Sequence, residues 1–304
     1  MASRFNEGFW RLADPKISIT SVASMAIGAA LAARDGSVSW SWLLVMGLAM
    51  FCMEVAKNAW GDVYDYDSGT DLAVKPEDRT GFSGGKRVLV DNILTRGQTW
   101  GIALLFGATG VALGAMMVFL REPSIFWLGT VALVLGWSYH GPPLQLAYRG
   151  LGELDVVLCY GPLIAMATYA LLTHSYSADV IWASMPLGLF IAGFLWVNEF
   201  PDYEADRSVG KNNLVVKLGR QRASRVFPLI YLLALALLAL AVWCDALPAA
   251  ALLGCAGAVP AAVAVWWTWQ QPQTFYRHRP AQPLALLAFV LLSAGISGGV
   301  LLSL

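Results

Sequence analysis

The sequence predicts an all-α integral membrane protein with about nine transmembrane helices. Of its 304 residues 58% are hydrophobic and only 13% are charged, and this composition is too apolar for a soluble domain of this length. Apolar runs of roughly 17 to 22 residues recur along the chain, and each is long enough to cross a ~30 Å hydrocarbon core as a helix. Alternating segments of about ten residues, which would indicate a membrane barrel, are absent from the sequence.

Nine apolar runs follow one another in order. They cover residues 17–33, 40–59, 99–120, 125–139, 154–172, 180–197, 227–243, 249–269 and 283–302. The fourth run is short, and the fifth begins beside Glu153 and Asp155, so these two depart most from an uninterrupted span. No linker or low-complexity tract divides the chain, and a single membrane domain over residues 1–304 accounts for it.

The basic residues predict the orientation of the bundle. Of the 20 Lys and Arg residues, 18 fall in the amino terminus and in the loops after the even-numbered spans, and only Arg34 and Arg121 fall opposite. The positive-inside rule makes the first side cytoplasmic, with the amino terminus inside and the carboxyl terminus outside, as expected for a bacterial inner membrane protein. Sixteen of the 20 acidic residues share that side. We therefore expect the chemistry at the cytoplasmic face, and the zero net charge argues against a nucleic-acid partner.

Two similar motifs stand at the cytoplasmic ends of the second and sixth spans. "NAWGD" (58–62) and "NEFPD" (198–202) both have the form N-x-x-x-D and lie 140 residues apart, which indicates an internal duplication. Residues three or four apart share one face of a helix. The two sets that this spacing groups are Asn58, Asp62 and Asp65, and Asn198, Asp202 and Asp206. Pro201 leaves the helical phase of the second set open.

Clustered carboxylates and amides predict a hard cation. Like charges on one helical face repel unless a cation lies between them, and oxygen ligands without Cys or paired His suit Mg²⁺. Two such clusters facing one another could hold Mg²⁺ with a diphosphate between them. The basic residues of "SGGKR" (83–87), together with Arg149 and Lys211, suit such an anion. The alternative is that these charges belong to solvated loops and serve topology and solubility only.

Four segments resemble the UbiA superfamily of intramembrane prenyltransferases, and most closely its MenA-like branch. The segments are "GDVYDYDSGTD" (61–71), "EDRTGFSGGKRVL" (77–89), "GPPLQLAYRGLGELDVVLCYGPL" (141–163) and "NEFPDYEADRSVGKNNLVVKLGR" (198–220). The resemblance implies nine transmembrane helices around a central cavity, with a cytoplasmic cap that holds two Mg²⁺ ions and a prenyl diphosphate. The polyprenyl tail would lie in the cavity, which would open sideways to membrane lipid.

The resemblance also implies roles for particular residues. Asp62, Asp65, Asp202 and Asp206 match catalytic, metal-binding positions, with Asn58 and Asn198 as further metal ligands. The residues expected to bind diphosphate are Arg149, Arg87, Lys211, Lys86 and Arg79. The residues expected near the substrate or the prenyl cation are Asp71, Tyr64, Tyr139, Tyr148 and His140, because aromatic faces stabilise cations. For His140 the alternative is an interfacial residue whose ring is satisfied by backbone groups.

The implied reaction is Mg²⁺-dependent transfer of a prenyl group to an aromatic acceptor. In the MenA-like branch this acceptor is 1,4-dihydroxy-2-naphthoate, used in menaquinone biosynthesis. The alternatives are another acceptor (4-hydroxybenzoate, homogentisate or a lipid alcohol) and a terpene cyclase of the same fold. A third class, a cation transporter, would place ionisable residues near mid-membrane, where Glu54 is the only inner-span candidate.

Two positions depart from the family pattern. Gly61 stands where an Asn usually precedes the first Asp, so Asn58 would take over that role, and the choice of metal ligand between Asp62 and Asp65 stays open. In "GKNNL" (210–214), Asn212 and Asn213 replace the basic or hydroxyl residues expected after Lys211. This second departure weakens the expectation of tight diphosphate binding there.

Overall fold

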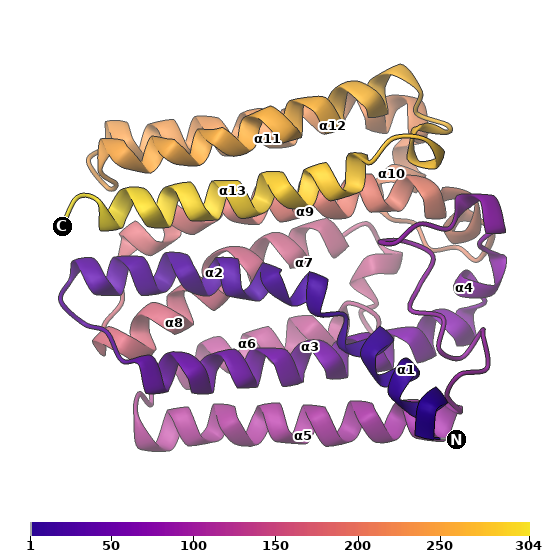
Figure 1. The fold of residues 1–304 in the computed structure, drawn as a ribbon, viewed down its shortest axis with the longest axis horizontal. Coiled ribbons are helices and arrows are strands. Elements are labelled where there is room, and N and C mark those ends of the chain that lie inside the picture. The colour runs from indigo at the N-terminus through magenta and orange to yellow at the C-terminus, as the bar shows by residue number, and fades with distance from the viewer. Residues whose placement is uncertain (1) are drawn as a thin grey trace.

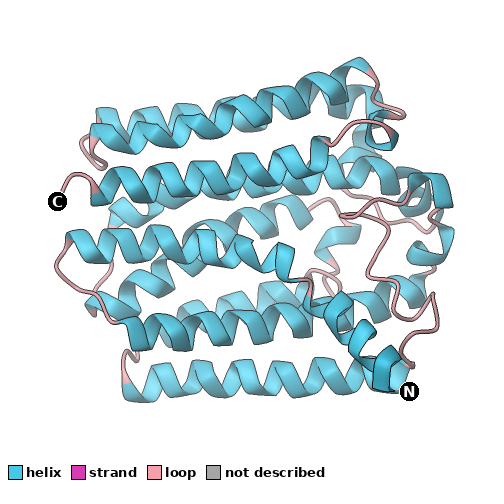
Figure 2. Ribbon diagram, in the orientation of Figure 1, coloured by secondary structure: helices cyan, strands magenta, loops and turns pink. Residues whose placement is uncertain are grey.

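The computed structural model describes residues 2–304, and every regular element in that range is a helix (Figure 2). Eight helical stretches are long and apolar enough to cross a membrane. They contain α2 (Pro15–Arg34), α3 (Trp40–Ser68), α5 (Arg96–Leu120), α7 with η3 and α8 (Gly152–Leu158, Cys159–Leu163, Ile164–Thr173), α9 (Ala178–Ser208), α11 (Arg220–Trp243), η4 with α12 (Ala249–Gly257, Ala258–Gln270) and α13 (Ala281–Leu301). The ninth apolar helix, α6 (Ile125–Ser138), has 14 residues and is the short fourth span of the sequence analysis.

Short elements gather at one end of the bundle, which we call the cap. They are α1 (Ala2–Ala13), α4 (Thr70–Ala73), η1 (Pro76–Asp78), η2 (Leu146–Tyr148), α10 (Leu214–Leu218) and η5 (Phe275–Arg277). Figure 1 shows α1, α4 and α10 at the end of the bundle where the chain begins, and the carboxyl terminus at the opposite end. The bundle with a capped end, expected from the family resemblance, is confirmed.

Two spanning helices continue into the cap beyond the expected ends of their apolar runs. Helix α3 extends nine residues past the expected end at 59 and stops at Ser68, where Gly69 adopts φ 85° and forms a left-handed C-cap. Helix α9 continues through Pro201 to Ser208. Both aspartate motifs are therefore helical, and the phase that Pro201 had left open is that of one continuous helix.

The fifth span is interrupted. Residues Cys159–Leu163 form a π-helical turn in which Gly161 has φ −90° and ψ −107° and Pro162 supplies no N–H donor. Such turns break the regular i→i−4 ladder and bend a helix. The carbonyl of Tyr160 accepts a hydrogen bond from the hydroxyl of Ser24 on α2 instead.

The exterior of the bundle is apolar. Trp40, Phe119 and Trp243 keep 80%, 83% and 85% of their surfaces exposed, although buried phenylalanines such as Phe190 and Phe227 are already available as a core. Large exposed apolar side chains at many positions are unfavourable in water and favourable in hydrocarbon. The protein is an integral membrane protein.

Charged residues divide between the two ends of the bundle. At the end away from the cap, Arg34 pairs with Asp179 at 2.8 Å and Glu122 with His174 at 2.7 Å. At the cap, Arg277 pairs with Asp78 at 2.6 Å. Arg34, expected on the side opposite to most basic residues, thus lies at the end away from the cap together with Glu122 and Asp179.

Close packing between α2 and α8 leads to a prediction about stability. A Cβ on Gly28 would lie 2.2 Å from the carbonyl oxygen of Ala165. We expect Gly28→Ala to lower the free energy of unfolding by about 1–3 kcal/mol, because the two backbones must separate. The readout is the thermal unfolding midpoint in detergent, followed by tryptophan fluorescence. Gly114→Ala is the matched control, because a Cβ on Gly114 would have nothing within 4 Å and Ala favours helix. Equal losses in both variants would contradict the packing argument.

Candidate active site

The two aspartate motifs meet at a cleft in the cap. Asp62 and Asp65 from α3, Asp71 from α4 and Asp202 from α9 line one cleft of about 640 Å³. Asn58 lines it as well. The structure therefore brings together the halves of the site that lie about 140 residues apart in the sequence.

Several buried oxygens around this cleft have no hydrogen-bond donor among the described residues. They are Asp62 Oδ1, Asp71 Oδ2 and Asp202 Oδ1 of residues that line the cleft, and Asn198 Oδ1 and Asp206 Oδ1, which belong to the same helix as Asp202 but are not among the lining residues. Burying a carboxylate oxygen without a partner is costly, and a bound cation removes that cost. Within residues 2–304 no three Asp, Glu, His or Cys side chains converge tightly enough to enclose an ion alone. This donor set fits Mg²⁺, which keeps water and substrate phosphate oxygens among its ligands.

The glycine pair of the "SGGKR" segment lies against both motifs. The N–H of Gly84 donates to Asp202 Oδ2 at 3.2 Å, and the N–H of Leu89 donates to Asp62 Oδ2 at 3.3 Å. Gly85 has φ 75°, and a Cβ there would lie 2.2 Å from Asp71 Oδ2. Only glycine permits this approach, so the segment orients the carboxylates through its backbone.

Lys211 links the two motifs by charge. Its ammonium lies 3.4 Å from both carboxylate oxygens of Asp65 and 3.7 Å from Asp206 Oδ1. Burial disfavours the charged amine, but the carboxylates of Asp206 and Asp65 outweigh burial and hold the pKa of Lys211 well above its usual value. Lys211 therefore stays cationic in the middle of the acidic cluster.

Asp71 and Tyr148 complete the surroundings of Asp65. Burial and the neighbouring charges of Asp65 and Asp62 raise the pKa of Asp71 well above its usual range. The hydroxyl of Tyr148 donates to Asp65 Oδ1 at 3.0 Å, and burial together with the Asp65 carboxylate raises the pKa of Tyr148 to about 12. The hydroxyl therefore remains a donor at neutral pH.

Asn213 has a structural role that the sequence analysis missed. Its amide nitrogen donates to Asp206 Oδ2 at 2.8 Å, while its side-chain oxygen accepts from the N–H of Val216 at 2.8 Å and caps α10. An Asn just before an apolar helical turn is a recognisable N-cap, and this was the available signal. The residue that the family pattern marks as unfavourable for the site instead fixes one of its carboxylates.

Only some of the residues expected to bind diphosphate lie near the aspartates. Lys86 lines the cleft and pairs with Asp14, and burial lowers the pKa of Lys86. Arg87 donates to the carbonyl of Asp71 at 3.0 Å and pairs with Asp91 at 3.1 Å. The structure does not bring the other two arginines to the aspartates: Arg79 donates to the carbonyl of Val74 and the exposed Arg149 to the carbonyl of Pro143. Arg11 and Lys16, which the sequence analysis had not singled out, line the cleft instead.

His140 fills the space beside Gly61. A Cβ on Gly61 would lie 2.9 Å from Cε1 of the imidazole. The ring lines the cleft with Nε2 3.6 Å from Asp65 Oδ2, and its buried Nδ1 has no hydrogen-bond partner among the described residues. The expectation that backbone groups satisfy this ring is wrong. Asn58, the proposed replacement for the usual Asn, donates to the carbonyl of Leu12 at 2.8 Å.

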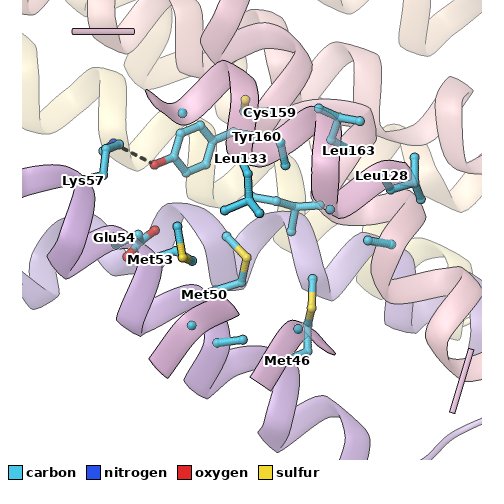
Figure 3. Close-up of a pocket in the computed structure, with 18 of the residues that line it drawn as sticks. Met46, Met50, Met53, Glu54, Lys57, Leu128, Leu133, Cys159, Tyr160 and Leu163 are labelled. Carbon is cyan, nitrogen blue, oxygen red and sulfur yellow. Dashed lines mark hydrogen bonds between the residues drawn. The ribbon is translucent and has the colours of Figure 1, made fainter. Parts of the chain in front are cut away.

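A second, apolar cavity of about 450 Å³ adjoins the cleft. Helices α3 and α9 line both spaces. On α3, Lys57 faces the cavity and the next residue, Asn58, faces the cleft; on α9, Asn198 faces the cavity and Asp202, one turn later, faces the cleft. Tyr139 lines the cavity, while Tyr64 packs against Trp100 and Trp137 instead of lining either space. Figure 3 shows methionines of α3 along one wall and Glu54 and Lys57 near Tyr160.

Acidic residues also line this cavity, and here the sequence expectation needs correction. Glu54 had been the only inner-span candidate, but Asp155 of α7 lines the same cavity and is buried. Glu199 of α9, one residue after Asn198, is buried too. The sequence placed Asp155 at the start of the fifth span, whereas the structure buries it in the first turn of α7, a helix that packs against α9.

Comparison with known proteins assigns the fold and the family. A family model described as the UbiA prenyltransferase family matches residues 21–293. The chain is 31% identical to UbiA prenyltransferase domain-containing protein 1 of Dictyostelium discoideum, over 70% of this chain and 64% of that protein. It is 29% identical to the 2-carboxy-1,4-naphthoquinone phytyltransferase of Synechocystis sp. (77% and 73%) and 25% identical to the 1,4-dihydroxy-2-naphthoate octaprenyltransferase of Bacillus subtilis (70% and 67%).

Solved structures share the architecture. A UbiA homolog from Aeropyrum pernix superposes with a TM-score of 0.70 at 19% identity, covering 91% of this chain and 96% of that one. A UbiA homolog from Archaeoglobus fulgidus, bound to GPP and Mg²⁺, superposes with a TM-score of 0.64 at 18% identity, covering 98% and 100%. With the two aspartate motifs, the cap and the apolar cavity in place, the chain belongs to the UbiA prenyltransferase family.

Proposed function

We propose that this protein transfers a prenyl group from a polyprenyl diphosphate to 1,4-dihydroxy-2-naphthoate, as a step of menaquinone biosynthesis. The observation that carries the proposal is the pair of helical aspartate motifs, which bring buried carboxylates with unpaired oxygens to a cleft beside an apolar cavity. The relatives support this acceptor, since those from Bacillus subtilis and Synechocystis sp. are named for naphthoate or naphthoquinone prenylation.

The residues present fit two Mg²⁺ ions, one for each motif. Asp62 and Asp65, with Asn58, would hold one ion, and Asp202 and Asp206, with Asn198, would hold the other. The Archaeoglobus fulgidus homolog bound to GPP and Mg²⁺ supports a divalent cation in a protein of this fold. When bound, Mg²⁺ would neutralise charge on the leaving diphosphate.

The protein's own side chains would then act on the two parts of the polyprenyl diphosphate, its diphosphate group and its hydrocarbon tail. Lys211 and Lys86 bind the diphosphate oxygens, which leave with the electron pair of the allylic C–O bond. The apolar cavity holds the polyprenyl tail and keeps water from the cationic carbon. The ring of Tyr139 lines the cavity and would stabilise the cation through its face, while Tyr148 holds Asp65 through its hydroxyl. An electron pair of the acceptor ring forms the new C–C bond, and loss of the ring carboxylate as CO₂ restores the aromatic ring.

The cap would face the cytoplasm of a bacterial cell. Eighteen of the 20 basic residues fall on the cap side in the sequence analysis, and the termini lie at opposite ends of the bundle (Figure 1). In this orientation a water-soluble aromatic acid would enter the site from the cytoplasm, and a lipid-borne diphosphate would enter it from the membrane. Polyprenyl diphosphate, aromatic acceptor and membrane lipid are therefore the proposed partners.

A transfer assay tests this function. Purified protein in lipid nanodiscs receives Mg²⁺ and a radiolabelled polyprenyl diphosphate, with 1,4-dihydroxy-2-naphthoate, 4-hydroxybenzoate or homogentisate offered separately. We expect a prenylated, decarboxylated naphthoquinol that forms only with Mg²⁺ and only from the naphthoate. Prenylation of a different ring would move the protein to another acceptor. Diphosphate release with a cyclised hydrocarbon and no transfer would instead support the cyclase alternative.

A further inference from the structure

The apolar cavity contains a polar cluster that neither the metals nor the prenyl tail explain. Glu54 and Lys57 lie one turn apart on α3, and Tyr160 reaches them from the π turn η3 (Figure 3). We call these three residues the Lys57 cluster. The surrounding wall is made of methionine and aliphatic side chains such as Met50 and Leu163. Ionisable residues at such a depth are expensive to bury and are commonly functional.

Lys57 has unused hydrogen-bonding capacity. An ammonium carries three donors, and the one partner found among the described residues is the Tyr160 hydroxyl at 3.1 Å. The ammonium also lies 5.5 Å from the centre of the Tyr160 ring. None of the ion pairs within 4.0 Å in residues 2–304 includes Lys57. Glu54 and Asp155 line the same cavity, but neither carboxylate lies within 4.0 Å of the ammonium, so its remaining donors are free.

Glu54 lines the same cavity and has one unpaired acceptor oxygen. Its carboxylate accepts a hydrogen bond from the Ser21 hydroxyl through Oε1. Its second oxygen, Oε2, is buried and has no donor among the described residues, and the residue is only 5% exposed. A hydrocarbon tail can satisfy neither this oxygen nor the free donors of Lys57.

The cluster lies at the right depth for the second substrate. Lys57 precedes Asp62 by five residues on one continuous helix, which places it about 7.5 Å deeper along the axis. Asn198 of α9 lines the cavity at the same level, four residues before Asp202. A ring bound at the cluster would therefore lie directly below the metal-lined cleft, beside the carbon from which the diphosphate departs.

We propose that the Lys57 cluster binds the acceptor, and that it selects a hydroxylated aromatic acid. Lys57 and the Tyr160 hydroxyl bind the carboxylate, and a ring hydroxyl donates to the Glu54 carboxylate. Because residues three apart on a helix are neighbours, the two groups of the ligand must be close together. An acid with its hydroxyl on the adjacent carbon fits this arrangement, whereas an acid with its hydroxyl across the ring does not. This inference rests on the proposed function and specifies the substrate class of that site.

Direct binding tests the inference without any turnover. The full-length protein in nanodiscs, without prenyl diphosphate, is titrated with 1-hydroxy-2-naphthoate, with 1-naphthol and with 4-hydroxybenzoate, using tryptophan fluorescence. We expect the wild type to prefer 1-hydroxy-2-naphthoate over 1-naphthol by about 10- to 100-fold, the range expected of a charge-assisted hydrogen bond. Lys57→Met should remove that preference and leave 1-naphthol binding unchanged. Tyr160→Phe, which keeps the ring, should reduce the preference severalfold and covers the case in which Lys57→Met does not fold.

The control and the contrary outcomes are distinct. Lys75→Met removes an exposed cap lysine and should leave all three affinities unchanged. If Lys57→Met and Tyr160→Phe keep the full preference for the acid, the proposed subsite is wrong. Prenyl transfer by a Lys57→Met variant with unchanged acceptor KM would also overturn the subsite while leaving the proposed function intact. Binding that depends on Lys57, with no transfer to any aromatic acid by the wild type, would support the subsite and reject the function.

Discussion

Replacing Asp62 or Asp202 by asparagine is expected to lower kcat/KM for prenyl transfer by about 10²- to 10³-fold at any Mg²⁺ concentration. Each carboxylate has one oxygen held by a backbone N–H and a second, buried oxygen with no donor in the described part of the chain. Asparagine keeps the shape and that backbone bond but removes the charge that a metal ion needs. A loss of this size is typical when one electrostatic contact to a developing charge is removed.

Stability separates this loss from misfolding. The aspartates repel one another before a metal binds, so each neutral variant should unfold at the same temperature as the wild type or at a higher one without Mg²⁺. The wild type should gain stability on adding Mg²⁺, and the variants should gain less, because a ligand stabilises only the state that binds it. The measurements are transfer rates and unfolding midpoints across a Mg²⁺ series.

Asp67→Asn is the matched control on the same helix. Asp67 follows Asp65 by two residues, but its half-exposed side chain pairs with Arg96 at the surface of the cap. Exposed pairs contribute little, and we expect near-wild-type activity from this variant. If Asp62→Asn or Asp202→Asn also keeps near-normal activity at low Mg²⁺, the two-motif metal site is wrong.

The spans and the aspartate motifs follow from local patterns in the sequence, and both could be predicted. An apolar run of sufficient length predicts a membrane helix whatever its packing partners are. Once a helix is assumed, the spacing of Asn58, Asp62 and Asp65 predicts that they share one face of it. The structure adds that α3 and α9 stay helical through both motifs. Helical periodicity was sufficient for the first motif, whose Asn58, Asp62 and Asp65 line one cleft, but in the second motif Asn198 lines the cavity and Asp202 the cleft.

The rest of the site depends on partners that are distant in sequence. His140 lies over Gly61, and Tyr160 bonds Lys57 across 103 positions, so no local pattern in the sequence reveals either contact. The direction of a loop side chain cannot be predicted from the sequence either, because it depends on the backbone angles of the loop. Arg87, for example, has φ 59° and pairs with Asp91. A motif that supplies the right residue type therefore does not fix where its charge is directed.

Lys211→Met is expected to separate metal binding from turnover. The ammonium of Lys211 lies among the oxygens of Asp65 and Asp206, where we expect it to compete with a metal ion and to bind the diphosphate. Without it, the carboxylates lose their internal counter-ion, so a divalent cation should bind several-fold more tightly in the absence of substrate. Turnover should nevertheless fall about 10²-fold, because the leaving diphosphate loses a positive partner. Mn²⁺ binding followed by electron paramagnetic resonance and the rate of prenyl transfer give the two readouts.

This variant is informative because metal affinity is expected to rise while the rate of prenyl transfer falls. A lysine that served only to hold the loop would weaken metal binding and turnover together when it is removed. Lys217→Met is the matched control, because Lys217 lies in the next element, donates to the carbonyl of Arg149 and reaches none of the aspartates among its described contacts. Lys211→Arg keeps the charge and should recover part of the rate while metal binding returns toward that of the wild type. If Lys211→Met binds metal more tightly but transfers more slowly, and Lys211→Arg recovers the rate, Lys211 binds the diphosphate. If Lys211→Met loses metal affinity and transfer rate together, this role is wrong.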